Sequence, residues 1–207
     1  MHVSAMTQGS GDSGVVPSRD VDALAAARCD ALTGAPEAPR TPDAWLFARL
    51  VAAREVRGEL PLLGLTHEQI DALGARHFVC AVMSEAPRMH VMADASHAAF
   101  ATAMHAFLVA LAAPQADPDD VRCLAAIIAH ACLRPDHLWR DLGLRGRDDV
   151  TSTLERFFPE VVARNVEGLR WKKLLARELA LASGAAPGPA PGCPGCEDFG
   201  FCFPAGH

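Results

Sequence analysis

Three of the seven cysteines lie close together near the C-terminus and have the spacing of metal ligands. The segment reads Cys193-Pro-Gly-Cys196-Glu-Asp-Phe-Gly-Phe-Cys202, a C-x2-C-x5-C pattern. Because Pro-Gly favours a tight turn, Cys193 and Cys196 can face one metal centre, with backbone amides directed toward their sulfur atoms. Thiolate is a soft ligand that suits zinc, Cu(I) and iron–sulfur clusters.

The number of cysteines in this motif bears on which metal it binds. Three cysteines do not complete a structural zinc site, which usually takes four Cys or His ligands. A cubane-type iron–sulfur cluster can be held by three cysteines, its fourth corner being vacant or occupied by another metal or by a non-thiolate ligand. The motif alone leaves zinc and iron–sulfur binding open. A tail with unligated thiols is less favoured, because exposed thiols are prone to oxidation.

The remaining cysteines are scattered along the chain, at Cys29, Cys80, Cys123 and Cys132. An odd cysteine count without an export signal argues against a disulfide framework and for free thiols or metal ligands. Three phenylalanines surround the last cysteine, at Phe199, Phe201 and Phe203. We expect them either to shield a cluster from water or to dock the tail on the rest of the protein.

Two histidines are weighed as further ligands. His130 follows Cys123 by two helical turns on one predicted face, a pattern that favours core packing over metal binding. His137 follows a Pro-Asp turn and precedes Trp139; it can bind a metal, or it can form a hydrogen bond with the backbone at the turn.

A short basic run, Arg170-Trp171-Lys172-Lys173, stands out in an otherwise acidic chain. Such a run is by default a solvated helix face. Its functional interpretation is attraction of an oxyanion or of an acidic partner surface, with Trp171 as an anchor.

The elements that must position these residues are predicted to be helices. The 207 residues include 39 alanines, no tyrosine and few β-branched residues, which favours helix over strand. We expect an all-α bundle of about six to seven helices. Start signals stand at Asp20, Thr41-Pro42, Thr66 and Asp117, and a long amphipathic helix is expected from Pro159 to Gly184.

The predicted organisation is a disordered segment over 1–19, a helical domain over 20–183, and a Pro/Gly linker with a cysteine tail over 184–207. A net charge of −6 argues against nucleic-acid and anionic-membrane binding. No apolar run is long enough to span a membrane and no secretory signal is present, so we expect a cytoplasmic protein. No nucleophile with a paired base and no phosphate loop is found, so an enzyme is not expected.

Several blocks occur together in an order that resembles the NifQ family of nitrogen-fixation proteins. These blocks are His137-Leu-Trp-Arg-Asp-Leu-Gly-Leu144, Phe158-Pro159, Asn165, Arg170-Trp-Lys-Lys173 and the cysteine tail, with a weaker likeness over residues 60–78. The resemblance covers about two thirds of the chain and excludes the first forty residues.

This resemblance implies a molybdenum-handling accessory protein rather than a catalyst. Family members are thought to carry an iron–sulfur cluster that incorporates molybdenum. They are thought to pass the metal to the proteins that assemble the nitrogenase iron–molybdenum cofactor, namely a scaffold and the nitrogenase iron protein. Molybdate is the implied source of the metal, and the implied ligands are Cys193, Cys196 and Cys202.

The sequence departs from the family pattern C-x4-C-x2-C-x5-C at one position, because Gly188 stands where the first cysteine is expected. The chain therefore either holds its cluster with three thiolates and another ligand or has altered metal binding. Candidates for the additional ligand are Cys132, Cys123, His130, His137, Glu197, Asp198 and His207. The alternatives from other classes are a zinc-stabilised helical interaction module and a small electron-transfer protein.

Overall fold

The computed structural model describes residues 18–34, 41–82 and 94–204, and this part of the chain is all-α. It contains no strand and ten α-helices, seven of which have eleven or more residues. The seven are α1 (Ser18–Thr33), α2 (Pro42–Glu55), α3 (His67–His77), α4 (Ala95–Ala110), α5 (Pro118–Ala131), α7 (Arg147–Phe157) and α9 (Trp171–Ala182). The short elements are α6 (Leu138–Asp141), α8 (Pro159–Ala163), α10 (Phe199–Cys202) and the 3₁₀ helices η1 (Leu60–Leu63) and η2 (Cys193–Gly195). The predicted all-α bundle is confirmed.

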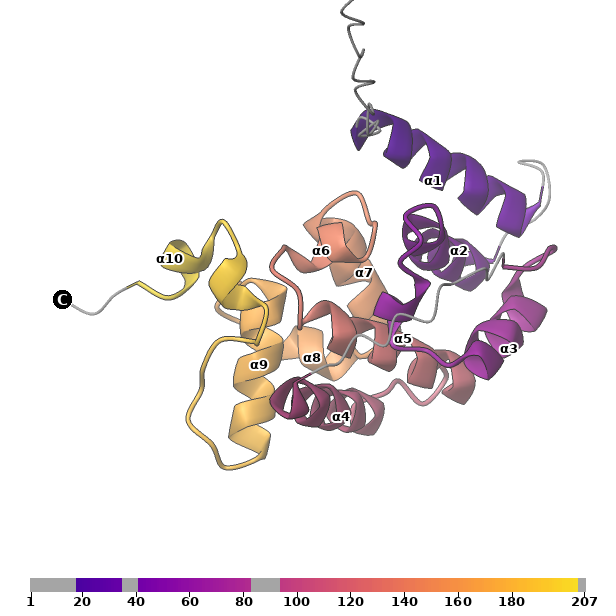
Figure 1. Ribbon diagram of the computed structural model, residues 1–207. Coiled ribbons are helices and arrows are strands. Elements are labelled where there is room, and N and C mark those ends of the chain that lie inside the picture. Colours follow the sequence, from indigo (N-terminus) through magenta and orange to yellow (C-terminus); the bar gives the residue numbers. More distant parts are fainter. Residues whose placement is uncertain (1–17, 35–40, 83–93, 205–207) are drawn as a thin grey trace, which may run out of the picture.

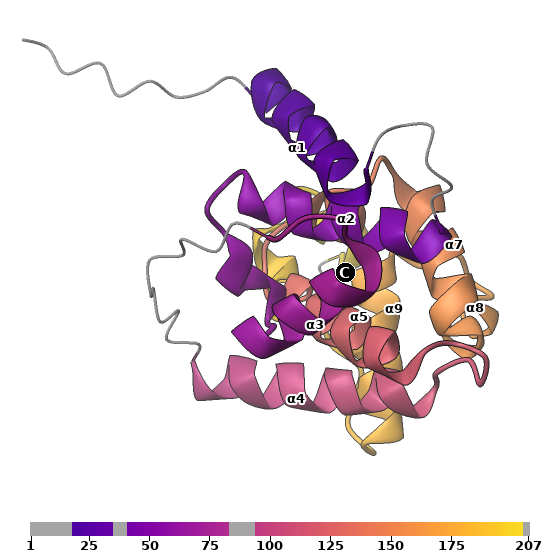
Figure 2. The same ribbon diagram turned by 90° about the vertical axis from the view of Figure 1, so that its right-hand side faces the viewer.

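Helix α5 is the centre of the bundle. Ten of its fourteen residues are buried, as expected for a helix that is covered on all sides. It packs against α3, α4, α6 and η1, while α1 lies on α2 at the outside. Figure 2 shows α1 and α4 on opposite faces with α2, α3 and α5 between them. The cysteine tail projects from the end of the molecule near α9 and α6 (Figure 1).

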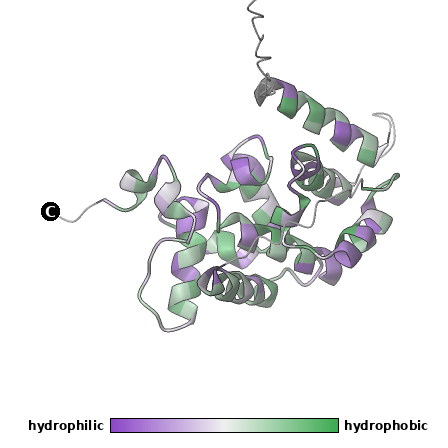
Figure 3. Cartoon of the chain, in the orientation of Figure 1, coloured by the Kyte–Doolittle hydropathy of each residue, from purple (hydrophilic) through white to green (hydrophobic). Residues whose placement is uncertain are grey.

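Hydropathy differs between the helices that cover α5. Figure 3 shows α3 largely hydrophilic and α4 largely hydrophobic. Within α4, the buried side chains are Ala101, Met104 and Leu108, which recur at spacings of three and four and face the core. No helix among the described residues is long and apolar enough to cross a membrane.

Three of the four predicted helix starts are confirmed by side-chain caps, whereas α1 begins at Ser18, two residues before the predicted Asp20. Thr41 accepts a hydrogen bond from the amide of Ala44 at 3.1 Å, with Pro42 in the first turn of α2. Thr66 and Gln69 form the complete capping box of α3, with bonds of 3.2 Å and 2.8 Å. These caps use residues close in sequence, which is why they were predictable.

The N-cap of α5 supports a prediction about stability. The Asp117 carboxylate accepts hydrogen bonds from the amides of Asp119 at 2.8 Å and Asp120 at 3.1 Å, and the bond from Asp120 is the main cause that lowers the pKa of Asp117. We expect Asp117→Ala to lower the free energy of unfolding by about 1 kcal/mol at pH 7. Because the folded-state pKa is below the unfolded one, this contribution is present above the ordinary carboxyl pKa of 3.8 and is lost as the pH falls through the folded-state value.

Urea denaturation of wild type and variant at neutral and acidic pH measures this effect. The difference between the two proteins should shrink as the pH falls below the ordinary carboxyl pKa. Asp71→Ala is a suitable control, since Asp71 is exposed on α3 and has no hydrogen bond or ion pair within the described part of the chain. A loss of stability from Asp117→Ala that is independent of pH would contradict the capping account.

The single long helix expected over residues 159–184 is wrong. The chain forms α8 and α9 with a turn between them, because Asn165 closes a local loop: its side chain accepts from the amide of Leu169 at 2.7 Å and donates to the carbonyl of Leu169 at 3.0 Å. Gly168 takes a positive φ of 65° in this turn. Arg147 also donates to the carbonyls of Gly168 and Leu169, at 3.1 Å and 2.8 Å. These bonds compete with the helix ladder.

The predicted disordered segment over 1–19 lies outside the described residues, except for its last two positions, where α1 begins.

Candidate metal centre

The cysteine tail is docked on the turn that follows α5, at Arg134-Pro135. The amide of Gly192 donates to the carbonyl of Cys132 at 3.0 Å. A Cβ added at Gly192 would lie 2.0 Å from the carbonyl oxygen of Arg134, and one added at Gly195 would lie 2.5 Å from Cβ of Pro135. Both glycines are therefore required for the close approach of two backbone segments. The turn fixes where the three cysteines stand relative to the helices.

A pocket of about 50 Å³ forms where the tail meets the N-terminus of α9 and the start of α6. We refer to it as the cysteine pocket. It brings together all three cysteines of the motif, Cys193, Cys196 and Cys202. Cationic side chains also line it, at Arg147, Arg170, Lys172 and Lys173, and so do aromatic ones, at Trp139, Trp171, Phe199 and Phe203, together with Asp136, His137, Leu138 and Asp198.

The three thiols differ in exposure. Cys193 is buried, while Cys196 and Cys202 are half-buried. Burial raises the pKa of Cys193 and of Cys202, opposed in part by the nearby positive charge of Lys172 for Cys193 and of Lys173 for Cys202. Metal binding must displace a proton from each of these two thiols, so metal affinity will fall as the pH is lowered.

Two cations at the pocket hold the tail in place. Arg170 forms a 2.7 Å ion pair with Asp198 and lies over the ring of Phe201, which is 79% exposed. Lys173 donates to the carbonyl of Cys202 and lies 5.0 Å from the ring centroid of Phe203. The basic run is thus attached to the tail by charge and by cation–π contact. The rings of Phe199 and Phe203 lie 5.3 Å apart, tilted by 34° to each other, and form one wall of the pocket.

Lys172 is not part of a solvated helix face. It is 5% exposed, and its ammonium group pairs with Asp141 and donates to the carbonyl of Arg134 at 2.9 Å. Arg54 and Arg134 also bind Asp141, at 3.3 Å and 3.0 Å. This buried network joins α2, α6 and α9 beneath the docked tail. The default interpretation of this residue as a solvated side chain is therefore wrong.

Trp171 presents a polar atom that lacks a partner. The side chain is 6% exposed and lines the cysteine pocket, and its Nε1 is buried without a hydrogen-bond acceptor among the described residues. Leaving such a donor unsatisfied costs about 1–3 kcal/mol, so a ligand that supplies an acceptor would be favoured.

Among the residues weighed as an additional ligand, His137 reaches the cysteine pocket. His130 does not line it; its Nδ1 lies 2.9 Å from the carbonyl oxygen of Ala126, and its ring packs against Gly64. Cys132 lies beneath the docked tail, where complete burial raises the pKa of its thiol to about 12, and it does not line the pocket.

The other candidates for the additional ligand are Asp198, Glu197, Cys123 and His207. Asp198 lines the pocket, whereas Glu197 and Cys123 do not. His207 lies outside the described residues. Gly188 is on the loop between α9 and η2, apart from the pocket lining, and a Cβ added there would meet no atom within 4 Å.

Four pocket residues were not singled out from the sequence as site residues, namely Asp136, Leu138, Trp139 and Arg147. Trp139 stacks on His137 with ring centroids 6.3 Å apart. The sequence feature that could have indicated a site residue here is the position of Trp139 between His137 and Arg140. Arg147 begins α7 and reaches the pocket across the turn at Gly168 and Leu169; no local pattern indicates this. Within the described residues, Arg147 and Lys173 form no ion pair with a carboxylate.

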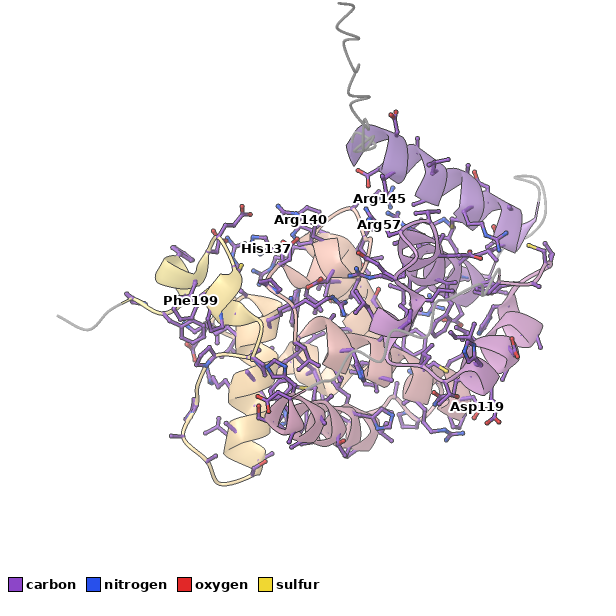
Figure 4. All side chains as sticks on the ribbon, viewed as in Figure 1. Arg57, Asp119, His137, Arg140, Arg145 and Phe199 are labelled. Atoms are coloured by element: carbon purple, nitrogen blue, oxygen red, sulfur yellow. The ribbon has the colours of Figure 1, made fainter. Side chains whose placement is uncertain are left out.

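A larger cleft of about 570 Å³ lies between α1, α2 and the loop after α6. Four arginines line it, but each has an acidic partner: Arg57 with Asp22, Arg140 with Asp136 and Glu197, and both Arg49 and Arg145 with Asp149. Figure 4 shows Arg57 and Arg145 beneath α1, and His137 and Phe199 toward the tail. The cleft holds none of the three cysteines of the motif.

No three His, Cys, Asp or Glu side chains in the described ranges converge closely enough to hold one metal ion. The three thiols share a pocket but do not meet at a single point.

Comparison with known proteins gives one family. The sequence model of the NifQ family matches residues 45–204, which is most of the chain and includes the cysteine tail. No solved structure matches the chain significantly.

Three curated relatives agree with the family match. A NifQ homolog of Sinorhizobium fredii is 44% identical over 83 residues, covering 40% of this chain and 36% of the relative. NifQ of Azotobacter vinelandii is 40% identical over 89 residues, covering 43% of this chain and 45% of the relative. NifQ of Klebsiella pneumoniae is 35% identical over 85 residues, covering 41% of this chain and 51% of the relative. The chain spans about half or less of the length of these relatives.

Proposed function

The chain belongs to the NifQ family of nitrogen-fixation proteins, and from this membership we propose that it carries a molybdenum–iron–sulfur cluster in the cysteine pocket and donates molybdenum for synthesis of the nitrogenase iron–molybdenum cofactor. Molybdate is the source of the metal. The recipients are the cofactor assembly proteins, a scaffold and the nitrogenase iron protein. In this proposal the protein is a cytoplasmic carrier and not a catalyst.

The observation that carries the proposal is that three soft ligands line one pocket. Cys193, Cys196 and Cys202 line the same small space, and the docking of Gly192 and Gly195 on the α5 turn holds that space against the helical body. Three thiolates can hold three metals of a cubane-type cluster and leave one corner for a metal that is transferred. Fewer protein bonds then need to break when that metal leaves.

The charges around the pocket support an anionic cargo. Sulfide and thiolate give such clusters negative charge, and molybdate is itself an oxyanion. Arg147 and Lys173 line the pocket without a carboxylate partner among the described residues, so both remain available to neutralise added negative charge. Their hydrogen bonds to backbone carbonyls hold them in place without cancelling their charge.

The donor set also fits the cluster. The orphaned Nε1 of Trp171 can donate a hydrogen bond to a sulfide or thiolate sulfur, and hydrogen bonds of this kind tune the potential of a cluster. Phe199 and Phe203 limit the access of water to the same space. When bound, the cluster supplies molybdenum in a form that can be passed on, and the protein contributes binding, orientation and shielding.

The zinc-stabilised interaction module is less well supported. A structural zinc needs four ligands around one ion, and no three candidate ligands converge in that way within the described ranges. A small electron-transfer protein would use the same pocket and is distinguished from a molybdenum carrier by metal content.

Anaerobic analysis of iron, sulfide and molybdenum tests the proposal. The wild-type protein, loaded with iron, sulfide and molybdate under reducing conditions, is expected to bind all three, whereas Cys196→Ala should lose most of the bound iron and molybdenum. Cys80→Ala is the matched control, since Cys80 is exposed and stands outside the pocket. This control should retain the wild-type metal content.

Three results would count against the proposal. Unchanged iron and molybdenum in Cys196→Ala would exclude the tail as the binding site. Iron and sulfide without molybdenum in the wild type would favour an electron-transfer protein. A single zinc in colourless protein would favour the interaction module.

A further inference from the structure

His137 holds a position that its local structure does not explain. It is the N-cap residue of α6, yet its side chain makes no capping hydrogen bond. The ring instead lies nearly parallel to Trp139, at an interplanar angle of 11°, and lines the cysteine pocket with 15% of its side chain exposed. The imidazole is therefore held in a fixed orientation at the wall of the pocket that faces the tail.

One ring nitrogen of His137 is engaged by the tail itself. Nε2 lies 3.3 Å from Oε1 of Glu197 and 3.5 Å from Oδ2 of Asp198, two residues between Cys196 and Cys202. A histidine that binds a metal usually donates its other ring N–H to a carboxylate, which fixes the ring and its tautomer. The tail carboxylates lie at ion-pair distance from Nε2 of His137, where they could accept that N–H. Nδ1 has no hydrogen-bond partner within the described part of the chain and is the nitrogen left for a metal.

We propose that His137 is the fourth protein ligand of the cluster, binding the corner that the three cysteines leave free through Nδ1. This inference rests on the proposed function, because it needs a cluster in the pocket. Three thiols in one space leave one metal of a four-metal cluster without a protein ligand. His137 lines that space, and imidazole is a common ligand of iron and other transition metals.

The charges facing His137 are consistent with this role. From the tail it faces Glu197 and Asp198, and these carboxylates are themselves paired with Arg140 and Arg170. The ring is thus held by a network that spans α6, the start of α9 and the tail. The same network ties the ligand to the segment that bears Cys196 and Cys202, so that histidine and thiols are positioned together.

The test compares four proteins loaded anaerobically with iron, sulfide and molybdate and then exchanged into buffer with a chelator and no small thiol. The variants are His137→Ala, His137→Gln and His137→Cys, beside the wild type. Metals and sulfide per chain are measured in each, and circular dichroism checks the fold. His105→Ala is the control, since His105 lies on α4 and does not line the pocket.

We expect His137→Ala and His137→Gln to lose one metal per cluster with sulfide unchanged, and His137→Cys to restore the full count. Glutamine is polar and similar in size but is a poor ligand for a soft metal, so it separates ligation from a structural role and serves if the alanine variant does not fold. The control should match the wild type. X-ray absorption at the molybdenum and iron edges should show imidazole scattering in the wild type and not in His137→Cys.

Full metal counts in His137→Ala or His137→Gln would overturn the assignment, as would imidazole scattering that persists in His137→Cys. A wild-type protein that binds neither iron nor molybdenum would refute the proposed function and the assignment with it. Normal metal binding by the wild type with no effect of any His137 variant would refute the assignment alone.

Discussion

Asp141→Asn is expected to lower the free energy of unfolding by about 3–5 kcal/mol, because it removes the carboxylate at which three cations meet, two of them buried and one half-buried. Asp141 accepts hydrogen bonds from Arg54, Arg134 and Lys172, and it is 8% exposed. Asparagine keeps the shape and removes the charge, so the three cations remain in a low-dielectric environment with mutual repulsion. Urea denaturation at neutral pH measures the loss.

The loss of stability in Asp141→Asn should come mainly from the positive charges left without a carboxylate, and not from the loss of the aspartate side chain itself. Arg54 keeps its ion pair with Glu59, whereas Asp141 is the one carboxylate partner of Lys172 among the described residues. Combining Asp141→Asn with Lys172→Met therefore removes a buried cation left without a carboxylate, so the double variant should lose less than the sum of the single variants. Glu160→Gln is the control, since its i,i+4 pair with Arg164 is exposed and should change stability by no more than about 0.5 kcal/mol. A loss below about 1 kcal/mol for Asp141→Asn would mean that water reaches the network.

Gly192→Ala is expected to detach the cysteine tail from the helical body. The added methyl group would stand 2.0 Å from the carbonyl oxygen of Arg134, which belongs to backbone and cannot move freely. Gly192 itself has φ −80° and ψ −14°, which alanine adopts readily, so the effect comes from the clash alone. Overpacking of this kind costs about 1–3 kcal/mol, which corresponds to roughly 5- to 160-fold faster amide exchange in the tail.

Hydrogen exchange followed by mass spectrometry of peptides over η2 and α10 measures this release. Gly188→Ala and Gly200→Ala are matched controls in the same tail, because an added Cβ meets no atom within 4 Å at either position. Under the proposed function, Gly192→Ala should also lose bound metal although every cysteine is intact. Wild-type exchange in Gly192→Ala would contradict the docked geometry.

The helices whose ends are marked by local chemistry were predictable. Thr41, Thr66 and Asp117 all cap helices as expected, because each cap forms within three residues of its donor amide. The break between α8 and α9 was missed, since Asn165 and Gly168 lie in a stretch with good helical periodicity. Arg147, from another helix, stabilises that break and is not local to it.

Within the candidate site, the burial of Lys172 was likewise not predictable from the local sequence. Beside Lys173 it reads as part of a charged surface, although it precedes the buried residues Leu175 and Ala176 by three and four positions and so shares their face. Its burial is tolerated because Asp141 and the carbonyl of Arg134 satisfy the ammonium group. Those partners come from elsewhere in the chain, and no pattern around Lys172 reveals them.

By itself, the sequence determined the helical class, the family resemblance and the three thiols, because composition, caps and short-range spacing are properties of neighbouring residues. Only the tertiary structure decided which side chains accompany those thiols: it placed His137 and Arg147 at the cysteine pocket and left His130 outside it. The physical reason is that these contacts depend on the close fit of Gly192 and Gly195 against the α5 turn. That fit joins segments about sixty residues apart, a separation over which local sequence carries no positional information.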